Sequence, residues 1–185
     1  MRRVVITGMG IVSSLGNNTQ EVLASLREGR SGIVQADDYV KYNFRSQVHG
    51  SLKIDLEEAL DRKTRRFMGD GAAYSYLAMQ QAISDAGLEE NEISNERTGA
   101  VLGSGGASTK AIVAAADVTR EKGPRKIGPT SVPKAMSSTV SANLSTLFKI
   151  KGPSYSISSA CTTSTGWRRS SHSSRAWRPR STSGR

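Results

Sequence analysis

One cysteine, Cys161, is the side chain of this sequence best placed for nucleophilic chemistry. It stands in SISSACTTST, directly after the alternating run SYSISS and among small side chains that would leave room for a carbonyl substrate. If a strand ended here and a helix began, the helix N–H groups would favour the thiolate, and the Cys161 N–H could donate to an oxyanion. A lone cysteine is more often buried and inert, so both interpretations stay open on spacing alone.

Neither metal chemistry nor disulfide formation finds support in the sequence. The chain has one cysteine and two histidines, His49 and His172, which lack the spacing of metal ligands. No apolar run approaches the ~20 residues of a membrane helix, and the N-terminal MRRVVITGMG lacks the apolar core of a signal peptide. We therefore expect a cytoplasmic protein with no metal and no membrane segment.

Positive charge is concentrated at the C-terminal end. Lys+Arg number 26 against 16 for Asp+Glu, which gives a net charge of +10. Residues 167–185 hold six arginines and no acidic residue, which leaves about +4 for residues 1–166. The body of the chain is therefore not expected to bind nucleic acid. A protein that contacts nucleic-acid phosphates through its arginine- and serine-rich tail is an alternative.

Strands and helices are predicted to alternate along residues 1–166, which is typical of an α/β fold with a mostly parallel sheet. Strands are expected at residues 3–7, at the start of 98–106, and at 154–159. Asn18 with Glu21 forms a capping pattern for a helix that stops at Gly29. A helix ending at Gly87 is predicted by an apolar stripe, which comprises Met68, Ala72, Tyr76, Met79, Ile83 and Ala86. A helix within 137–149 is predicted by Val140, Leu144 and Leu147 and is expected to be closed by Gly152 and Pro153.

Two glycine-rich stretches do not match nucleotide-binding motifs. After Gly8 and Gly10, the third glycine of a dinucleotide fingerprint would fall at residue 13, which is Ser13. Residues 103–108, GSGGAS, lack the Gly-Lys-Ser/Thr ending of a P-loop. Close approach of the backbone is the expected role of both stretches, and ligand contact at 103–108 stays open.

Several segments, in this order and at these separations, resemble the N-terminal part of a β-ketoacyl-acyl-carrier-protein synthase, most closely the bacterial type I enzyme. The segments are MRRVVITGMGIVSSLGNN, GRSGI, DRKTRRFM, GSGG, KAM and FKIKGPSYSISSACTTS. The resemblance implies the N-terminal half of a thiolase-like fold, an acyltransferase of fatty-acid biosynthesis and a homodimer. It implies a decarboxylating Claisen condensation in which Cys161 accepts the acyl group as a thioester. No cofactor is implied, because the substrates are carried on the phosphopantetheine of acyl-carrier protein.

The same resemblance assigns a partner to the basic cluster in DRKTRRFM. Residues at the positions of Arg62, Lys63 and Arg66 form, in the family, a docking surface for the acidic acyl-carrier protein. Arg125 and Lys126 extend this surface in a weaker prediction. Met136, in KAM, is predicted with least support to border the acyl pocket, since a core methionine explains it equally well.

The resemblance ends at about residue 166, so we expect two parts: residues 1–166 as the family half and residues 167–185 as a tail outside it. Trp167, Arg168 and Arg169 can be encoded by TGG CGA CGC, and these bases, read one position later, encode Gly-Asp-Ala, a step common in the family. We therefore expect the tail to be translated out of frame or to be disordered. The family's two catalytic histidines and lysine have no match here, so the chain as written is expected to be inactive and to leave an apolar face exposed.

Three alternatives remain on sequence grounds. A type II elongating synthase has the same fold and nucleophile. A non-catalytic fragment that binds carrier protein would use only the basic cluster. A nucleic-acid-binding protein would use the tail.

Overall fold

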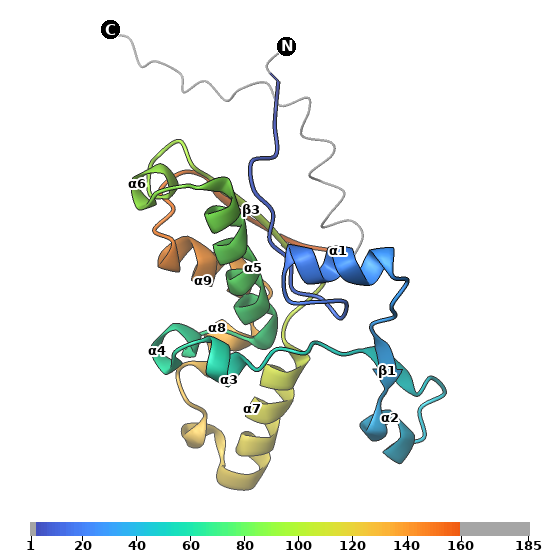
Figure 1. Ribbon diagram of the computed structural model, residues 1–185. Helices are drawn as coiled ribbons and strands as arrows, with labels where there is room; N and C mark the ends of the chain where they lie inside the picture. The colour runs from blue at the N-terminus through green and yellow to red at the C-terminus, as the bar shows by residue number, and fades with distance from the viewer. Residues whose placement is uncertain (1–2, 160–185) are drawn as a thin grey trace, which may run out of the picture.

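The computed structural model describes residues 3–159 (Figure 1). The N-terminal part contains α1 (Thr19–Arg27), β1 (Ile33–Gln35), α2 (Asp37–Lys41), β2 (Val48–Gly50), α3 (Leu56–Ala59) and α4 (Arg62–Arg65). It is followed by α5 (Asp70–Ala86), α6 (Glu90–Ile93), β3 (Ala100–Ser104) and α7 (Thr109–Lys122). The last described elements are η1 (Pro124–Lys126), α8 (Ser131–Ala135), α9 (Thr139–Leu147) and β4 (Ser154–Ser158).

The parallel pair of strands β3 and β4 is the structural base for the candidate site. Its register runs from Ala100 opposite Ser154 to Ser104 opposite Ser158. The crossover between them contains α7, η1, α8 and α9, and α9 packs against both strands and against α5. The hairpin of β1 and β2 is antiparallel and lies, with α2, apart from this pair (Figure 1). A parallel pair covered by helices agrees with the predicted α/β class.

The hydrophobic core lies between α3, α5 and α9. Its buried members are Leu56, Leu60, Met68, Ala72, Ala73, Val140 and Leu144. Tyr76 of α5 stacks on Phe148 at the end of α9, with ring centroids 5.1 Å apart. The predicted apolar stripe is confirmed from Ala72, which is buried, to Ala86, because its members between are half-buried. Met68 is buried but precedes the helix, which begins at Asp70. Helix α5 ends as predicted at Gly87, whose φ of +65° suits glycine.

Helix α1 confirms the predicted capping signals at both ends. Asn18 Oδ1 accepts a hydrogen bond from the Glu21 N–H at 2.9 Å, and the Glu21 carboxylate accepts from the Asn17 N–H at 2.8 Å. The reciprocal bond therefore reaches one residue further back than in a standard capping box. Gly29 follows the helix with a φ of +65°.

The predicted strand at residues 3–7 is wrong. This segment forms no strand, and Val4, Val5 and Ile6 are 83%, 73% and 84% exposed. A strand needs a neighbour to take its backbone hydrogen bonds, and no strand of the described range 3–159 lies beside this one. The next residues do confirm the predicted close approach, because a Cβ on Gly10 would lie 1.8 Å from the Ala78 carbonyl oxygen in α5.

The predicted end of the last helix is also wrong. Helix α9 ends at Leu147, and Lys149 adopts a φ of +51° two residues later. Gly152 has a different role, since a Cβ there would lie 2.5 Å from the Thr98 carbonyl oxygen. Gly152 therefore allows the chain entering β4 to come close to the chain entering β3.

Candidate functional site

Cys161, the predicted nucleophile, lies outside the described residues. The chain leading to it is described as far as Ser159, whose N–H donates to the Ser104 carbonyl at 3.4 Å. Because β3 and β4 are parallel, their carboxyl ends meet at one edge of the pair. The glycine-rich residues that follow β3 and the residues that lead toward Cys161 therefore start from the same edge.

The turn after β3 leads directly into a capped helix. Ser104 Oγ donates to the Gly106 carbonyl at 2.6 Å, and Ser108 Oγ accepts from the Ala111 N–H at 3.3 Å, which caps α7. This places the amino end of α7 next to the same edge of the strand pair. Ser108 and Lys110, at that end, also line a hollow in the surface.

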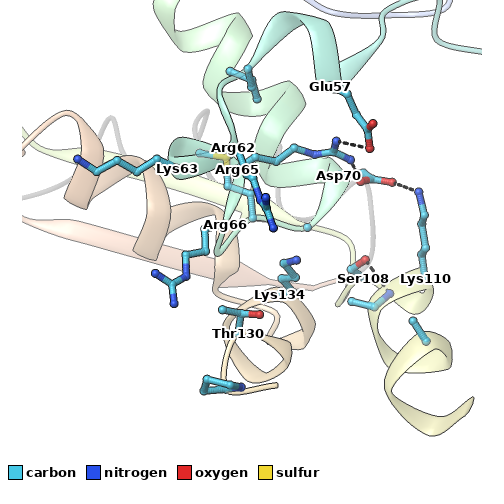
Figure 2. A pocket seen from close by; sticks show the side chains of 16 residues that line it. Glu57, Arg62, Lys63, Arg65, Arg66, Asp70, Ser108, Lys110, Thr130 and Lys134 are labelled. Carbon is cyan, nitrogen blue, oxygen red and sulfur yellow. Dashed lines mark hydrogen bonds and ion pairs between the residues drawn. The ribbon is translucent and has the colours of Figure 1, made fainter. Parts of the chain in front are cut away.

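That hollow is an open groove of about 1310 Å³ between α3, α4, the start of α5, α7 and α8, which we call the cationic groove. Six basic residues line it: Arg62, Lys63, Arg65, Arg66, Lys110 and Lys134. Glu57 and Asp70 are the acidic residues in its lining. Figure 2 shows these side chains leaving separate elements around the groove. The four basic residues of α4 and its cap were predicted to cluster, and all four line this groove.

Local sequence explains why α4 forms. Asp61 is its N-cap: one carboxylate oxygen accepts from the Lys63 and Thr64 N–H groups at 2.9 and 3.0 Å. The Thr64 hydroxyl donates to the other oxygen at 2.5 Å. The hydroxyl bond from Thr64, followed by the backbone bonds, lowers the pKa of Asp61 below its ordinary value of 3.8. Asp61 therefore fixes the first turn of α4 and the direction in which its basic side chains leave the backbone.

The four basic residues at α4 are not equivalent. Arg65 is 27% exposed and pairs with Glu57 at 3.2 Å and with Asp70 at 3.6 Å. Arg62, Lys63 and Arg66 are exposed and make no ion pair within the described residues. Lys63 extends away from the paired carboxylates in Figure 2. Three cations are therefore open to a partner, whereas the fourth is already bound within the protein.

Asp70 also binds a second cation, on the other wall of the groove. Its carboxylate lies 2.9 Å from the Lys110 ammonium of α7. The hydrogen bond and the charge of Asp70 raise the pKa of Lys110 above its ordinary value of 10.5, so Lys110 stays charged at neutral pH.

A buried amide holds the connection between α4 and α5. Asn143 of α9 is 9% exposed, and its Nδ2 donates to the Phe67 carbonyl at 3.2 Å and to the Thr139 carbonyl at 2.8 Å. The Arg66 guanidinium lies over the Phe67 ring, 5.4 Å from its centroid. The ring on which Arg66 lies thus belongs to a residue that is bound to α9 by a hydrogen bond spanning 76 residues.

The other predicted site residues lie elsewhere. Arg125 and Lys126 are exposed in η1 and do not line the groove. Met136 caps the carboxyl end of α8 and is half-buried, also outside the groove lining. His49 packs edge-on against Tyr39 with centroids 5.7 Å apart, and His172 falls outside the described range.

The sequence did not single out Asp70, Lys110 or Lys134. No local signal marks Asp70 or Lys110, because the pair they form spans 40 residues. Lys134 belongs to the KAM segment, but its place in the groove lining depends on how α8 packs. Across residues 3–159, no group of three or more His, Cys, Asp or Glu side chains could hold a metal ion. No helix in that range has the length and apolar character to cross a membrane.

Comparison with known proteins places this geometry in a family. Residues 1–167 match the family model described as "Beta-ketoacyl synthase, N-terminal domain". The chain belongs to the beta-ketoacyl synthase family. The 3-oxoacyl-[acyl-carrier-protein] synthase 1 of Haemophilus influenzae is 54% identical to it over 165 residues. That match covers 89% of this chain and 41% of the relative, so this chain spans less than half of that protein's length.

Solved structures of beta-ketoacyl synthases share the same fold. A beta-ketoacyl synthase from Burkholderia phymatum matches with a TM-score of 0.71 at 29% identity, over 86% of this chain and 40% of its own. AntDE, a ketosynthase solved in complex with the type II polyketide acyl-carrier protein AntF, matches with a TM-score of 0.70 at 16% identity, over 92% and 46% of the chains. The predicted fold class, the N-terminal half of a thiolase-like α/β fold, is confirmed.

Proposed function

We propose that this chain supplies the nucleophile and the carrier-docking surface of a 3-oxoacyl-acyl-carrier-protein synthase of type I in fatty-acid biosynthesis. The observation that carries the proposal is the family match, which extends through residue 167 and therefore includes Cys161. The relative that is 54% identical has the same activity in its name. The type II elongating synthase is the alternative within the family.

In the proposed first step, Cys161 takes the acyl group from acyl-carrier protein. The cysteine sulfur attacks the thioester carbonyl, a new acyl–sulfur bond forms, and the pantetheine thiol of the carrier leaves with the proton. Malonyl-carrier protein then loses CO₂, and its carbanion attacks the acyl-cysteine to give the 3-oxoacyl product and the Cys161 thiolate, which takes up a proton from water. The substrates bring their own pantetheine arms, so we propose that the chain binds no cofactor.

The cationic groove supports the docking half of the proposal. Arg62, Lys63 and Arg66 are exposed and carry no ion pair within residues 3–159, so they are available to an acidic surface. A ketosynthase of this fold has been solved with its acyl-carrier protein. We propose acyl-carrier protein as the partner here, a homodimer as the assembly of the whole synthase and the cytoplasm as its location.

A chimera tests the catalytic proposal. Residues 1–166 replace the matching part of the Haemophilus influenzae synthase, and the product is assayed with acyl- and malonyl-carrier protein. We expect 3-oxoacyl product from the chimera and none from its Cys161→Ala variant, because the nucleophile is lost. A soluble, folded chimera that retains Cys161 but forms no acyl-enzyme by mass spectrometry would contradict the proposal. Acyl chains of graded length then separate the type I from the type II assignment.

The 185-residue polypeptide alone is expected to make no condensation product. Neither His49 nor His172 stands in a motif that matches the family's histidines, and such catalytic groups act as a unit. Turnover comparable with the chimera would contradict this expectation.

A further inference from the structure

Asp70 occupies a position in the cationic groove that simple charge complementarity does not explain. A groove that attracts an acidic partner is weakened by a carboxylate among its cations, because like charges repel. Asp70 is nevertheless only one-third exposed and is committed to two partners, Arg65 and Lys110. Its charge therefore serves contacts within the chain.

The two partners of Asp70 belong to opposite walls of the groove. Arg65 is the last residue of α4, which also carries Arg62 and Lys63, whereas Lys110 is in the first turn of α7. Asp70 itself begins α5, between the two walls. Figure 2 shows the chain of contacts from Glu57 through Arg65 and Asp70 to Lys110. One carboxylate thus links three helices at the mouth of a single groove.

We propose that Asp70 is a positioning residue for carrier docking, which holds α4 and α7 at a fixed separation so that Arg62, Lys63 and Arg66 present their charges in one arrangement. Arg65 is part of this internal link and does not contact the carrier. The inference rests on the proposed docking function, but it concerns a residue of the wrong charge to take part in docking directly.

The direction in which Asp70→Asn changes the affinity for the carrier distinguishes a positioning role from simple electrostatics. Removing an acidic charge from a cationic groove should tighten binding of an acidic protein if charge alone matters. If Asp70 positions the walls, Asp70→Asn frees Arg65 and Lys110 and weakens binding. Glu57→Gln is the matched control, because it removes the same charge from the same groove. Glu57 is 83% exposed and bonds to Arg65 alone, so its loss leaves the link to α7 intact.

The test measures binding of the 185-residue chain to fluorescently labelled acyl-carrier protein of Haemophilus influenzae by anisotropy, at several salt concentrations. We expect Asp70→Asn to raise Kd about fivefold and Glu57→Gln to lower it slightly or leave it unchanged. Asp70→Glu, which keeps the carboxylate, should restore binding to near the parent value. Tighter binding by Asp70→Asn, equal to that of Glu57→Gln, would overturn the inference.

Lys110→Gln tests the same link from the other wall and covers the case in which Asp70→Asn does not fold. The loss of a docking cation reduces the salt dependence of Kd, because one ionic contact with the partner disappears. A positioning residue weakens binding without reducing that dependence, which is the result we expect for Lys110→Gln. A reduced salt dependence would make Lys110 an ordinary docking cation and contradict the inference.

Lys63→Glu separates failure of the inference from failure of the proposed function. We expect it to weaken carrier binding and to reduce its salt dependence. If the parent chain binds no carrier, or if Lys63→Glu binds as well as the parent, the docking function fails and the inference falls with it. If Lys63→Glu weakens binding while Asp70→Asn tightens it, only the inference fails.

Discussion

Two short segments of this chain, RVVIT at residues 3–7 and SYSIS at residues 154–158, have opposite outcomes. The first has the stronger strand composition, with four consecutive β-branched residues, yet it forms no strand and is exposed. The second has serine at every other position and forms β4, because β3 offers a parallel edge and α9 packs on both strands. Strand formation here is therefore decided by an available neighbour and by support from a helix, more than by β propensity.

The packing of α9 that supports the β3–β4 pair can be weakened by a substitution in the hydrophobic core. Leu144 of α9 is 1% exposed in the cluster against which Leu102 of β3 packs. Leu144→Ala leaves a cavity and should lower the free energy of unfolding by about 3 kcal/mol, measured by urea denaturation. Ile6→Ala, a change of similar size in the exposed segment, should cost under about 0.5 kcal/mol. Equal losses for both would mean that residues 3–7 are packed as firmly as the core around Leu144.

The pairing itself can be broken where the two strands begin. A Cβ on Gly152 would lie 2.5 Å from the Thr98 carbonyl oxygen, so Gly152→Ala must push the strand entries apart. We expect a loss of about 2 kcal/mol, with faster hydrogen exchange at the Ala100 N–H, which donates to the Pro153 carbonyl. Gly106→Ala is the control, because nothing lies within 4 Å of its added Cβ. Unchanged exchange at Ala100 in Gly152→Ala would contradict this account of the glycine.

The same distinction explains which elements could be predicted from the sequence. Helices α1 and α5 carry their own start and stop signals, and Asn18, Gly29 and Gly87 act as those signals require. Residues 3–7 carry an equally clear local pattern but need a neighbouring strand that the pattern cannot supply. The end of α9 was misplaced because Gly152 serves the close approach to Thr98 and does not end the helix.

The residues of the candidate site also fall into those that could be predicted from the sequence and those that depend on tertiary packing. Arg62, Lys63, Arg65 and Arg66 are near in sequence, so their cluster was visible before the fold was known. Lys110, Lys134 and Asp70 were not, because the groove brings together α4, α5, α7 and α8, and tertiary packing alone sets those distances. That Arg65 is occupied by internal ion pairs while Arg66 is open also has no trace in the sequence.

The N-cap of α1 is a local signal, and we expect it to stabilise the protein although residues 3–7, which precede α1, form no strand. Asn18→Ala removes the acceptor of the Glu21 N–H and should cost about 1 kcal/mol of stability, seen as a lower urea midpoint. Asn18→Asp retains the accepting oxygen and should lose much less. If Asn18→Ala has no effect, the tertiary contacts of α1 hold it without its cap, and the contrast between local and paired elements weakens.

The smallest expected effect concerns an ion pair between the segments that precede β3 and β4. Glu90 of α6, ahead of β3, lies 2.6 Å from the Lys149 ammonium, ahead of β4. The hydrogen bond and charge of Lys149 lower the pKa of Glu90 below its ordinary 4.5, and Glu90 raises the pKa of Lys149 above its ordinary 10.5. The pair therefore stabilises the fold between pH 4.5 and 10.5. Its contribution is lost as the pH falls through the lowered pKa of Glu90 or rises through the raised pKa of Lys149.

Lys149→Gln should therefore lower Tm at pH 7, by less than Asn18→Ala does, because both charged groups are exposed and screened by water and salt. Glutamine removes the charge of Lys149 at a position whose φ is +51° in the parent. The difference in Tm between parent and variant should shrink at pH 3 and in 0.5 M NaCl, about the concentration at which surface pairs are largely screened. A difference that persists under both conditions would assign the stabilisation to packing of the lysine stem, and the strand entries would then be held without this ion pair.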